Sequence, residues 1–157
     1  MAKTSSKPAL LRVAMQDIHA GKRLLAQHLP AIAARIGDRE LHAILTADAD
    51  RAAQQAERFG QEGFDTDGPP NLWMNGILDD AARDTRDHVA GDVLDIALVG
   101  AIRKAKAAEI VSLETAIALA RQAGHDAAEA MLAADHQADM ATDAALARRL
   151  AALTDTR

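Results

Sequence analysis

The sequence contains no cysteine, and it has only one tryptophan, two phenylalanines and four prolines among its 157 residues. Without cysteine there is no disulfide framework, no thiolate metal ligand and no cysteine nucleophile. A β-rich fold is disfavoured, because strands are enriched in aromatic and β-branched residues. The abundance of alanine instead favours helices that pack closely through small side chains.

Several other classes of protein are disfavoured by what is absent. No apolar run approaches the roughly 20 residues that a membrane-spanning helix requires. Residues 1–8 are polar and are followed by no apolar core of a signal peptide. The formal net charge of -5 disfavours a nucleic-acid binder, which would present a basic face. We therefore expect a cytoplasmic protein with no membrane or nucleic-acid partner.

The length fits one domain, which we place at residues 8–154 after a flexible tail at residues 1–7. Apolar residues within the domain recur every three or four positions, which is the period of one helix face. With the glycines and capping residues between them, these stripes predict helices at 8–37, 38–60, 71–88, 92–124 and 125–153.

The ends of these helices have recognisable markers. Pro30 should kink the first helix or end it before Gly37, the natural stop. Asp38 is expected to cap the second helix, and Asp92 the fourth. Residues 60–71 contain glycines and two adjacent prolines, so they form a long central connection. Four long helices and a short one predict an all-α, ferritin-like up-down four-helix bundle with one additional short helix.

Each long helix carries a charged residue in the middle of its apolar stripe. These residues are Lys22, Asp48, Glu109 and Asp135, with Asp139 one turn further along the last helix. A buried carboxylate needs a cation, a metal, hydrogen bonds or a proton, because desolvating its charge is costly. Lys22 alone cannot neutralise three acids, so we expect a shared proton or help from Lys106 or Arg23.

The remaining basic residues and histidines carry weaker signals. Arg103, Lys104 and Lys106 form a short basic run, for which a solvated helix face is the favoured interpretation. Four histidines are single and scattered, and we expect them at the surface or at helix ends: His19, His28, His42 and His125. The sequence contains no glycine-rich phosphate loop and no Gly-x-Ser-x-Gly motif.

Four short segments, in order along residues 10–153, resemble those of a known family. They are Ala20-Gly21-Lys22-Arg23-Leu24-Leu25, Met74-Asn75-Gly76-Ile77-Leu78, Ala105-Lys106-Ala107-Ala108-Glu109-Ile110-Val111 and Leu132-Ala133-Ala134-Asp135. The set is similar to the YciE/YciF group of small ferritin-like stress proteins. This resemblance implies a ferritin-like bundle, a di-metal centre and a link to the stress response.

The chain departs from the family at the residues that would hold the metals. Gly21 stands in place of the first-helix Glu, and the second-helix His is replaced by Asp48 or by a residue one position away. The other departures from the family pattern are Lys106, Ala107 and Ala134. Glu109 and Asp135 survive, and Asp48 with Asp50 supplies further carboxylates.

Three interpretations of these charged residues stay open. A di-iron or di-manganese site needs carboxylates and imidazoles converging from several helices. Against it, the chain has no Glu-x-x-His, and His136-x-x-Asp139 has the reversed order. The favoured interpretation is a residual polar layer, in which Lys22 is a counter-charge facing Asp48, Glu109 and Asp135 and helps fix the helix register. The third leaves several of these groups in solvent.

These observations favour a metal-degenerate ferritin-like protein with a non-catalytic, structural or interaction role and no cofactor. A link to stress follows from the resemblance alone. The alternative is an enzyme, a di-iron or di-manganese oxidase or peroxide-handling protein with iron or manganese held by Asp48, Glu109 and Asp135. A ligand-binding bundle is a third class, but scarce aromatics indicate no pocket for a cofactor. We expect a homodimer formed through helix faces.

Overall fold

The computed structural model describes residues 3–155, and within them every regular element is an α-helix. The helices are α1 (Lys7–Ala33), α2 (Arg39–Gln61), α3 (Leu72–Asp87), α4 (Asp92–Gln122) and α5 (Asp126–Leu153). The all-α fold is therefore confirmed. The predicted tail at residues 1–7 lies partly outside the described residues, and its last residue, Lys7, already belongs to α1.

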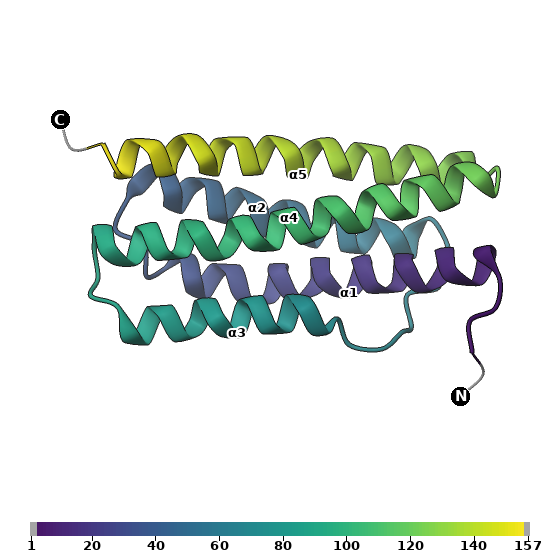
Figure 1. Cartoon of the computed structure of the whole chain (residues 1–157), viewed down its shortest axis with the longest axis horizontal. Helices are drawn as coiled ribbons and strands as arrows, with labels where there is room; N and C mark the ends of the chain where they lie inside the picture. The colour runs from purple at the N-terminus through teal and green to yellow at the C-terminus, as the bar shows by residue number, and fades with distance from the viewer. Residues whose placement is uncertain (1–2, 156–157) are drawn as a thin grey trace.

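The four long helices lie alongside one another, and α3 lies against α1 and α4 over part of their length (Figure 1). α1 and α2 form one antiparallel hairpin, and α4 and α5 form the other. Between the hairpins, the connection at residues 62–71 and then α3 carry the chain back along the bundle, so that α2 and α4 run in the same direction. This is the predicted bundle, with the short helix after the central connection.

The helix ends follow the capping chemistry at most positions. Side chains of Ser6, Asp38, Asn71 and His125 accept hydrogen bonds from the first turns of α1, α2, α3 and α5. The prediction that Asp92 caps α4 is wrong. Gly91 takes that position with a φ of 108°, which favours glycine, and it makes no side-chain capping bond.

The end of α1 matches one of the two outcomes expected of Pro30, because the helix ends early. The helix continues through Pro30 but stops at Ala33, before Gly37. The amide of Gly37 instead donates to Oδ1 of Asp95 at 3.0 Å, and the amide of Asp38 donates to Oδ2 at 2.9 Å. The buried carboxylate of Asp95 therefore holds the α1–α2 turn against α4.

α3 is fastened to α1 by polar contacts at its beginning. Trp73 Nε1 donates to Oδ2 of Asp17 at 2.9 Å, and Asn71 Nδ2 donates to the carbonyl oxygen of the same residue at 2.9 Å. Gly21 faces Asn71, and a Cβ at Gly21 would lie 3.0 Å from the side-chain nitrogen Nδ2 of Asn71. The close approach of α3 therefore suits glycine at position 21.

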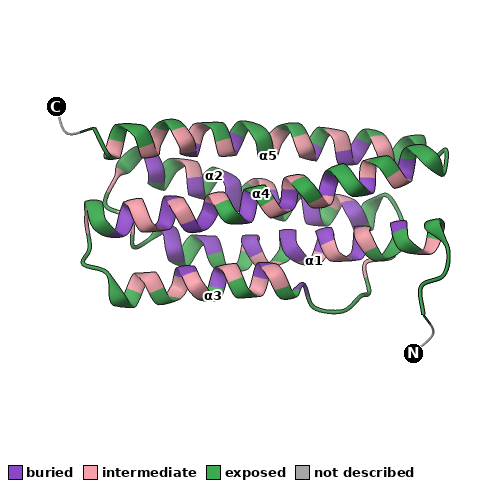
Figure 2. Ribbon diagram, viewed as in Figure 1, coloured by how far each residue is buried: buried purple, intermediate pink, exposed green. Residues whose placement is uncertain are grey.

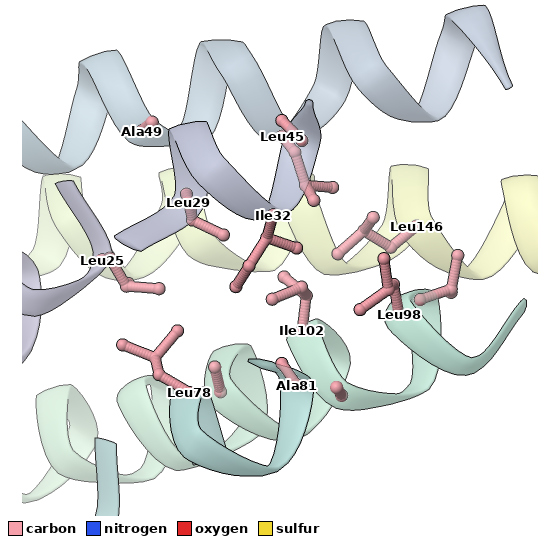
Figure 3. Packing of buried hydrophobic residues seen from close by; sticks show 14 of the residues in the cluster. Leu25, Leu29, Ile32, Leu45, Ala49, Leu78, Ala81, Leu98, Ile102 and Leu146 are labelled. Carbon is pink, nitrogen blue, oxygen red and sulfur yellow. The ribbon is translucent and has the colours of Figure 1, made fainter. Parts of the chain in front are cut away.

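Buried residues recur along all five helices (Figure 2), and the apolar ones form two clusters along the bundle. Cluster 1 lies where α3 covers the bundle, and Figure 3 shows ten labelled members: Leu25, Leu29, Ile32, Leu45, Ala49, Leu78, Ala81, Leu98, Ile102 and Leu146. Cluster 2 lies towards the α4–α5 turn, with Leu11, Met15, Ile18, Phe59, Leu113, Ala116, Ala120, Ala128, Met131 and Leu132. Within residues 3–155, no helix combines the length and the apolar character needed to cross a membrane.

Candidate functional site: a buried layer of lysines and carboxylates

Between the two apolar clusters lies a set of charged side chains that we call the polar layer. It consists of Lys22 on α1, Asp48 on α2, Lys106 and Glu109 on α4, and Asp135 and Asp139 on α5. Each of these residues is at most 3% exposed. The layer follows from helical periodicity, because each residue falls on the stripe that faces the bundle axis in its own helix.

Lys22 joins α1 to α4 and α5. Its Nζ lies 2.9 Å from Oε1 of Glu109 and 2.7 Å from Oδ2 of Asp139. Within the described residues these are its only ion pairs, and the lysine side chain is fully buried. One ammonium group therefore balances carboxylates from two other helices.

Lys106, on α4, is the second buried cation of the layer. Its Nζ lies 2.7 Å from Oδ2 of Asp48, 2.8 Å from Oε2 of Glu109 and 3.3 Å from Oδ1 of Asp139. Glu109 and Asp139 thus each bridge the two lysines, with one oxygen directed at each ammonium group. An ammonium group has three donor positions, and Lys106 faces three carboxylates.

Two arginines of α2 complete the charge balance from the edge of the bundle. Arg51 Nη1 lies 3.4 Å from Oδ1 of Asp48 and donates to the Thr142 hydroxyl at 2.9 Å, while Arg58 pairs with Asp135. Both arginine side chains are more than one third exposed, so their charges stay partly hydrated. The layer and its two arginines hold four cations and four carboxylates, a formal charge of zero.

The pKa values of two layer residues are shifted by this environment. Burial alone would lower the pKa of Lys106, but attraction to Glu109, Asp48 and Asp139 outweighs burial, so the pKa rises and the ammonium form persists. Burial raises the pKa of Asp135, although Arg58 and Lys22 oppose the shift. Oδ2 of Asp135 is also buried without a hydrogen-bond partner. Asp135 is therefore the least satisfied acid of the layer.

Two further carboxylate oxygens accept no hydrogen bond, but each lies close to an ammonium group. Oδ2 of Asp48 and Oε1 of Glu109 are buried without a hydrogen bond. They nevertheless lie 2.7 Å and 2.9 Å from the ammonium groups of Lys106 and Lys22. At these distances in a desolvated site, Coulomb attraction remains strong even where the alignment is poor. Both oxygens therefore have a counter-charge within the layer.

The residues of the layer do not fit a di-metal centre. The carboxylates converge on two ammonium nitrogens, and no imidazole belongs to the layer. Within residues 3–155, no group of three or more histidine, aspartate or glutamate side chains is arranged to hold a metal ion. A divalent ion here would add charge to a layer that is already neutral, and it would lie close to fixed cations.

The predicted residues meet, but with different partners. Lys22 contacts Glu109 as the polar-layer interpretation predicts, but its second partner is Asp139. Asp48 pairs with Lys106 and Arg51, and Asp135 pairs with Arg58. Asp50, the nearby alternative to Asp48, is exposed.

The structure differs from the sequence-based expectation at two residues of the layer. The basic run favours a solvated face for Lys106, but Lys106 is fully buried, as its suggested role as a helper of Lys22 requires, and it has more carboxylate partners than Lys22. Arg23, the other suggested helper, is exposed. Asp139 was absent from the predicted ligand set, although its position one turn after Asp135 places both acids on the same face of α5.

Comparison with known proteins agrees with this architecture. Residues 8–157 match the family described as "Domain of unknown function (DUF892)". The chain belongs to this family. None of the curated proteins compared with the chain matches it significantly.

Two solved structures are similar over almost the whole chain. The stress protein YciF of E. coli has 21% sequence identity and a TM-score of 0.92, with 98% of this chain and 100% of that chain covered. YcfI from Rhodopseudomonas palustris, whose description proposes a structural protein, has 24% identity and a TM-score of 0.85, with 90% and 93% covered. At these identities the likeness shows the fold. The predicted ferritin-like bundle and the resemblance to the YciE/YciF group are confirmed.

Proposed function

We propose that this chain is a metal-independent ferritin-like protein with a non-catalytic, structural or interaction role in the stress response. The observation that carries the proposal is the pair of buried ammonium groups, Lys22 and Lys106, which lie 2.7–3.3 Å from the carboxylates of Asp48, Glu109 and Asp139. In this protein the lysines supply the positive charge that a metal would bring to a carboxylate layer.

The stress-related and structural parts of the proposal draw support from similar proteins. One similar structure is named a stress protein, and the description of the other proposes a structural role. A layer of buried ion pairs suits such a role, because pairing across four helices penalises every other register of the bundle even where it adds little net stability. The layer would then keep one surface geometry available for a partner.

Self-association is part of the same proposal. We expect a cytoplasmic homodimer, which light scattering behind a sizing column would report as twice the chain mass of 16.6 kDa. A single mass of 16.6 kDa at micromolar concentration would remove the homodimer from the proposal but leave the role of the lysines untouched.

Metal analysis tests the metal-independent part directly. Tag-free protein from cells supplied with iron and manganese is analysed for bound metal, and its thermal unfolding is recorded with and without a chelator. We expect far less than one metal ion per chain and an unchanged unfolding midpoint. Near-stoichiometric metal that is lost in Glu109→Ala or Asp135→Ala would overturn the proposal. It would support the di-iron or di-manganese alternative.

A further inference from the structure

A second polar site lies outside the layer, where the connection at residues 62–71 passes α1. Two adjoining pockets of about 270 and 450 Å³ open there, and four residues line both: His19, Arg23, Gln27 and Thr66. Thr66 belongs to the connection, and the other three residues lie on α1. Both are open hollows, and the larger one has the volume of a site for a small molecule.

The wall of this site is held in place by hydrogen bonds. Gln16 Nε2 donates to Oδ2 of Asp65 at 3.1 Å and to the carbonyl oxygen of Asp67 at 2.9 Å. A Cβ at Gly68 would lie 2.8 Å from Cβ of Gln16, so the connection packs directly against α1 at this point. The pockets are therefore bounded by fixed backbone, which reduces the ordering cost of binding.

His19 is unusual for a buried polar residue. It is 9% exposed, it lines both pockets, and its ring makes no hydrogen bond to any residue in the described part of the chain. Its ring contacts Phe59, with 5.9 Å between the centroids. Burial lowers the pKa of His19, and the positive charge of Arg23 lowers it further, so the neutral ring is favoured. The ring nitrogens are not among the fully buried atoms without a partner in the described residues, so they are open to the pockets, where a polar ligand can replace the water that meets them.

Arg23 supplies the charge at the same site. It is exposed, and among residues 3–155 no carboxylate lies within ion-pairing distance of its guanidinium. Asp67 lines one pocket and Glu57 the other, and these acids favour a ligand with one oxyanion group over a ligand with several. A planar guanidinium forms its best-matched hydrogen bonds with an oxyanion, two at a time.

We propose that the pocket formed by His19, Arg23 and Thr66 binds one oxyanion group, a phosphate or a carboxylate, of a small polar molecule. Arg23 binds the oxyanion with its two parallel N–H groups, and the neutral ring of His19 donates one N–H to it. The negative charge of the ligand removes the repulsion between Arg23 and a protonated His19. Binding therefore raises the pKa of His19, which makes this histidine a reporter of occupancy.

The test follows histidine ring resonances by NMR in ¹⁵N-labelled full-length protein. Inorganic phosphate and acetate are titrated separately at constant ionic strength set by sodium chloride. His28, an exposed histidine on the same helix, is the internal reference. We expect the His19 resonance to shift with saturation and its pKa to rise at saturation. Saturation by phosphate alone, acetate alone or both assigns the group that the site accepts.

Two variants decide whether the site is built from these residues. Arg23→Gln should weaken binding by about tenfold or more, the factor lost with a charge-assisted hydrogen bond. Arg12→Gln removes an exposed arginine from α1 outside the two pockets and should leave binding unchanged. A His19 shift that never saturates, or one that is equal in Arg23→Gln and the original chain, would overturn the proposal.

Discussion

The apolar clusters and the polar layer between them are equally buried, but they specify the bundle in different ways. The clusters consist mainly of leucine, isoleucine, methionine and alanine, with Val99 and Phe59, and the attraction between these side chains is non-directional and tolerates small shifts. The layer consists of charges that pair at 2.7–3.3 Å, and all of these lysine–carboxylate pairs except Lys106–Glu109 join different helices. The clusters account for most of the stability, whereas the layer determines which residues face one another.

Lys106→Met should produce the largest effect. Methionine roughly keeps the length of the side chain but removes the charge that faces Asp48, Glu109 and Asp139. Leaving buried charge unpaired costs about 3–5 kcal/mol of unfolding free energy, which urea denaturation would measure. Lys104→Met, at an exposed position of the same helix, is the matched control. A loss below about 1 kcal/mol would mean that the layer behaves like hydrated surface charge.

Ile102→Val in cluster 1 should have a smaller effect. Ile102 is fully buried, and removing one methylene group from such a position costs about 0.5–1.5 kcal/mol. Urea denaturation should show a lower midpoint with an unchanged slope, because the surface exposed on unfolding is nearly the same. An effect as large as that of Lys106→Met would remove the proposed difference between cluster and layer.

Asp135→Asn should lower the free energy of unfolding less than Asp139→Asn does, although both acids lie on α5. The pKa of Asp135 is raised by burial, so the folded state binds its proton more tightly than the unfolded state. Relative to Asp135→Asn, the original chain should therefore gain stability as the pH falls towards the ordinary carboxyl value of 3.8. Denaturation at several pH values between neutral and 5 would measure this trend. The opposite trend would contradict the assignment.

Breaking the surface pair of Asp38 with Arg149 should change the stability least. The pH dependence of its contribution is opposite to that of Asp135, because the pKa of Asp38 is lowered and not raised. The Arg149 hydrogen bond lowers the pKa of Asp38, and the backbone amide of Leu41 adds to the shift. Its stabilisation is present above the ordinary value of 3.8 and is lost as the pH falls through the lowered pKa. Arg149→Gln should move the acid-unfolding midpoint to higher pH. An unchanged midpoint would show that the pair contributes nothing.

The helices were predictable because their stripes are long and periodic, and Asp38 was recognisable as a cap. The start of α4 was misassigned because Asp92 and Gly91 are both plausible caps, and only the backbone conformation distinguishes them. Local sequence does not reveal such a choice when it depends on how a turn meets the rest of the fold.

The polar layer was predictable only in part. Lys22, Asp48, Glu109 and Asp135 each interrupt a stripe that is otherwise apolar, which is a strong signal. Lys106 lies among Ala105, Ala107 and Ala108. Because alanine fits on either a buried or an exposed face, the apolar stripe of α4 has no clear edge there, and the sequence does not show whether Lys106 is buried. The burial of His19 was not predictable, because it depends on packing in the bundle and beside the connection at residues 62–71.

A double-mutant cycle between Lys106 and Asp48 tests most directly whether lysines neutralise the buried carboxylates. Lys106→Met, Asp48→Asn and the double variant are compared by urea denaturation with the original chain, in which Nζ lies 2.7 Å from Oδ2. If the lysines neutralise these carboxylates, the double variant should be more stable than the sum of the single effects implies, by about 1–3 kcal/mol. Effects that add to within about 0.5 kcal/mol would contradict it.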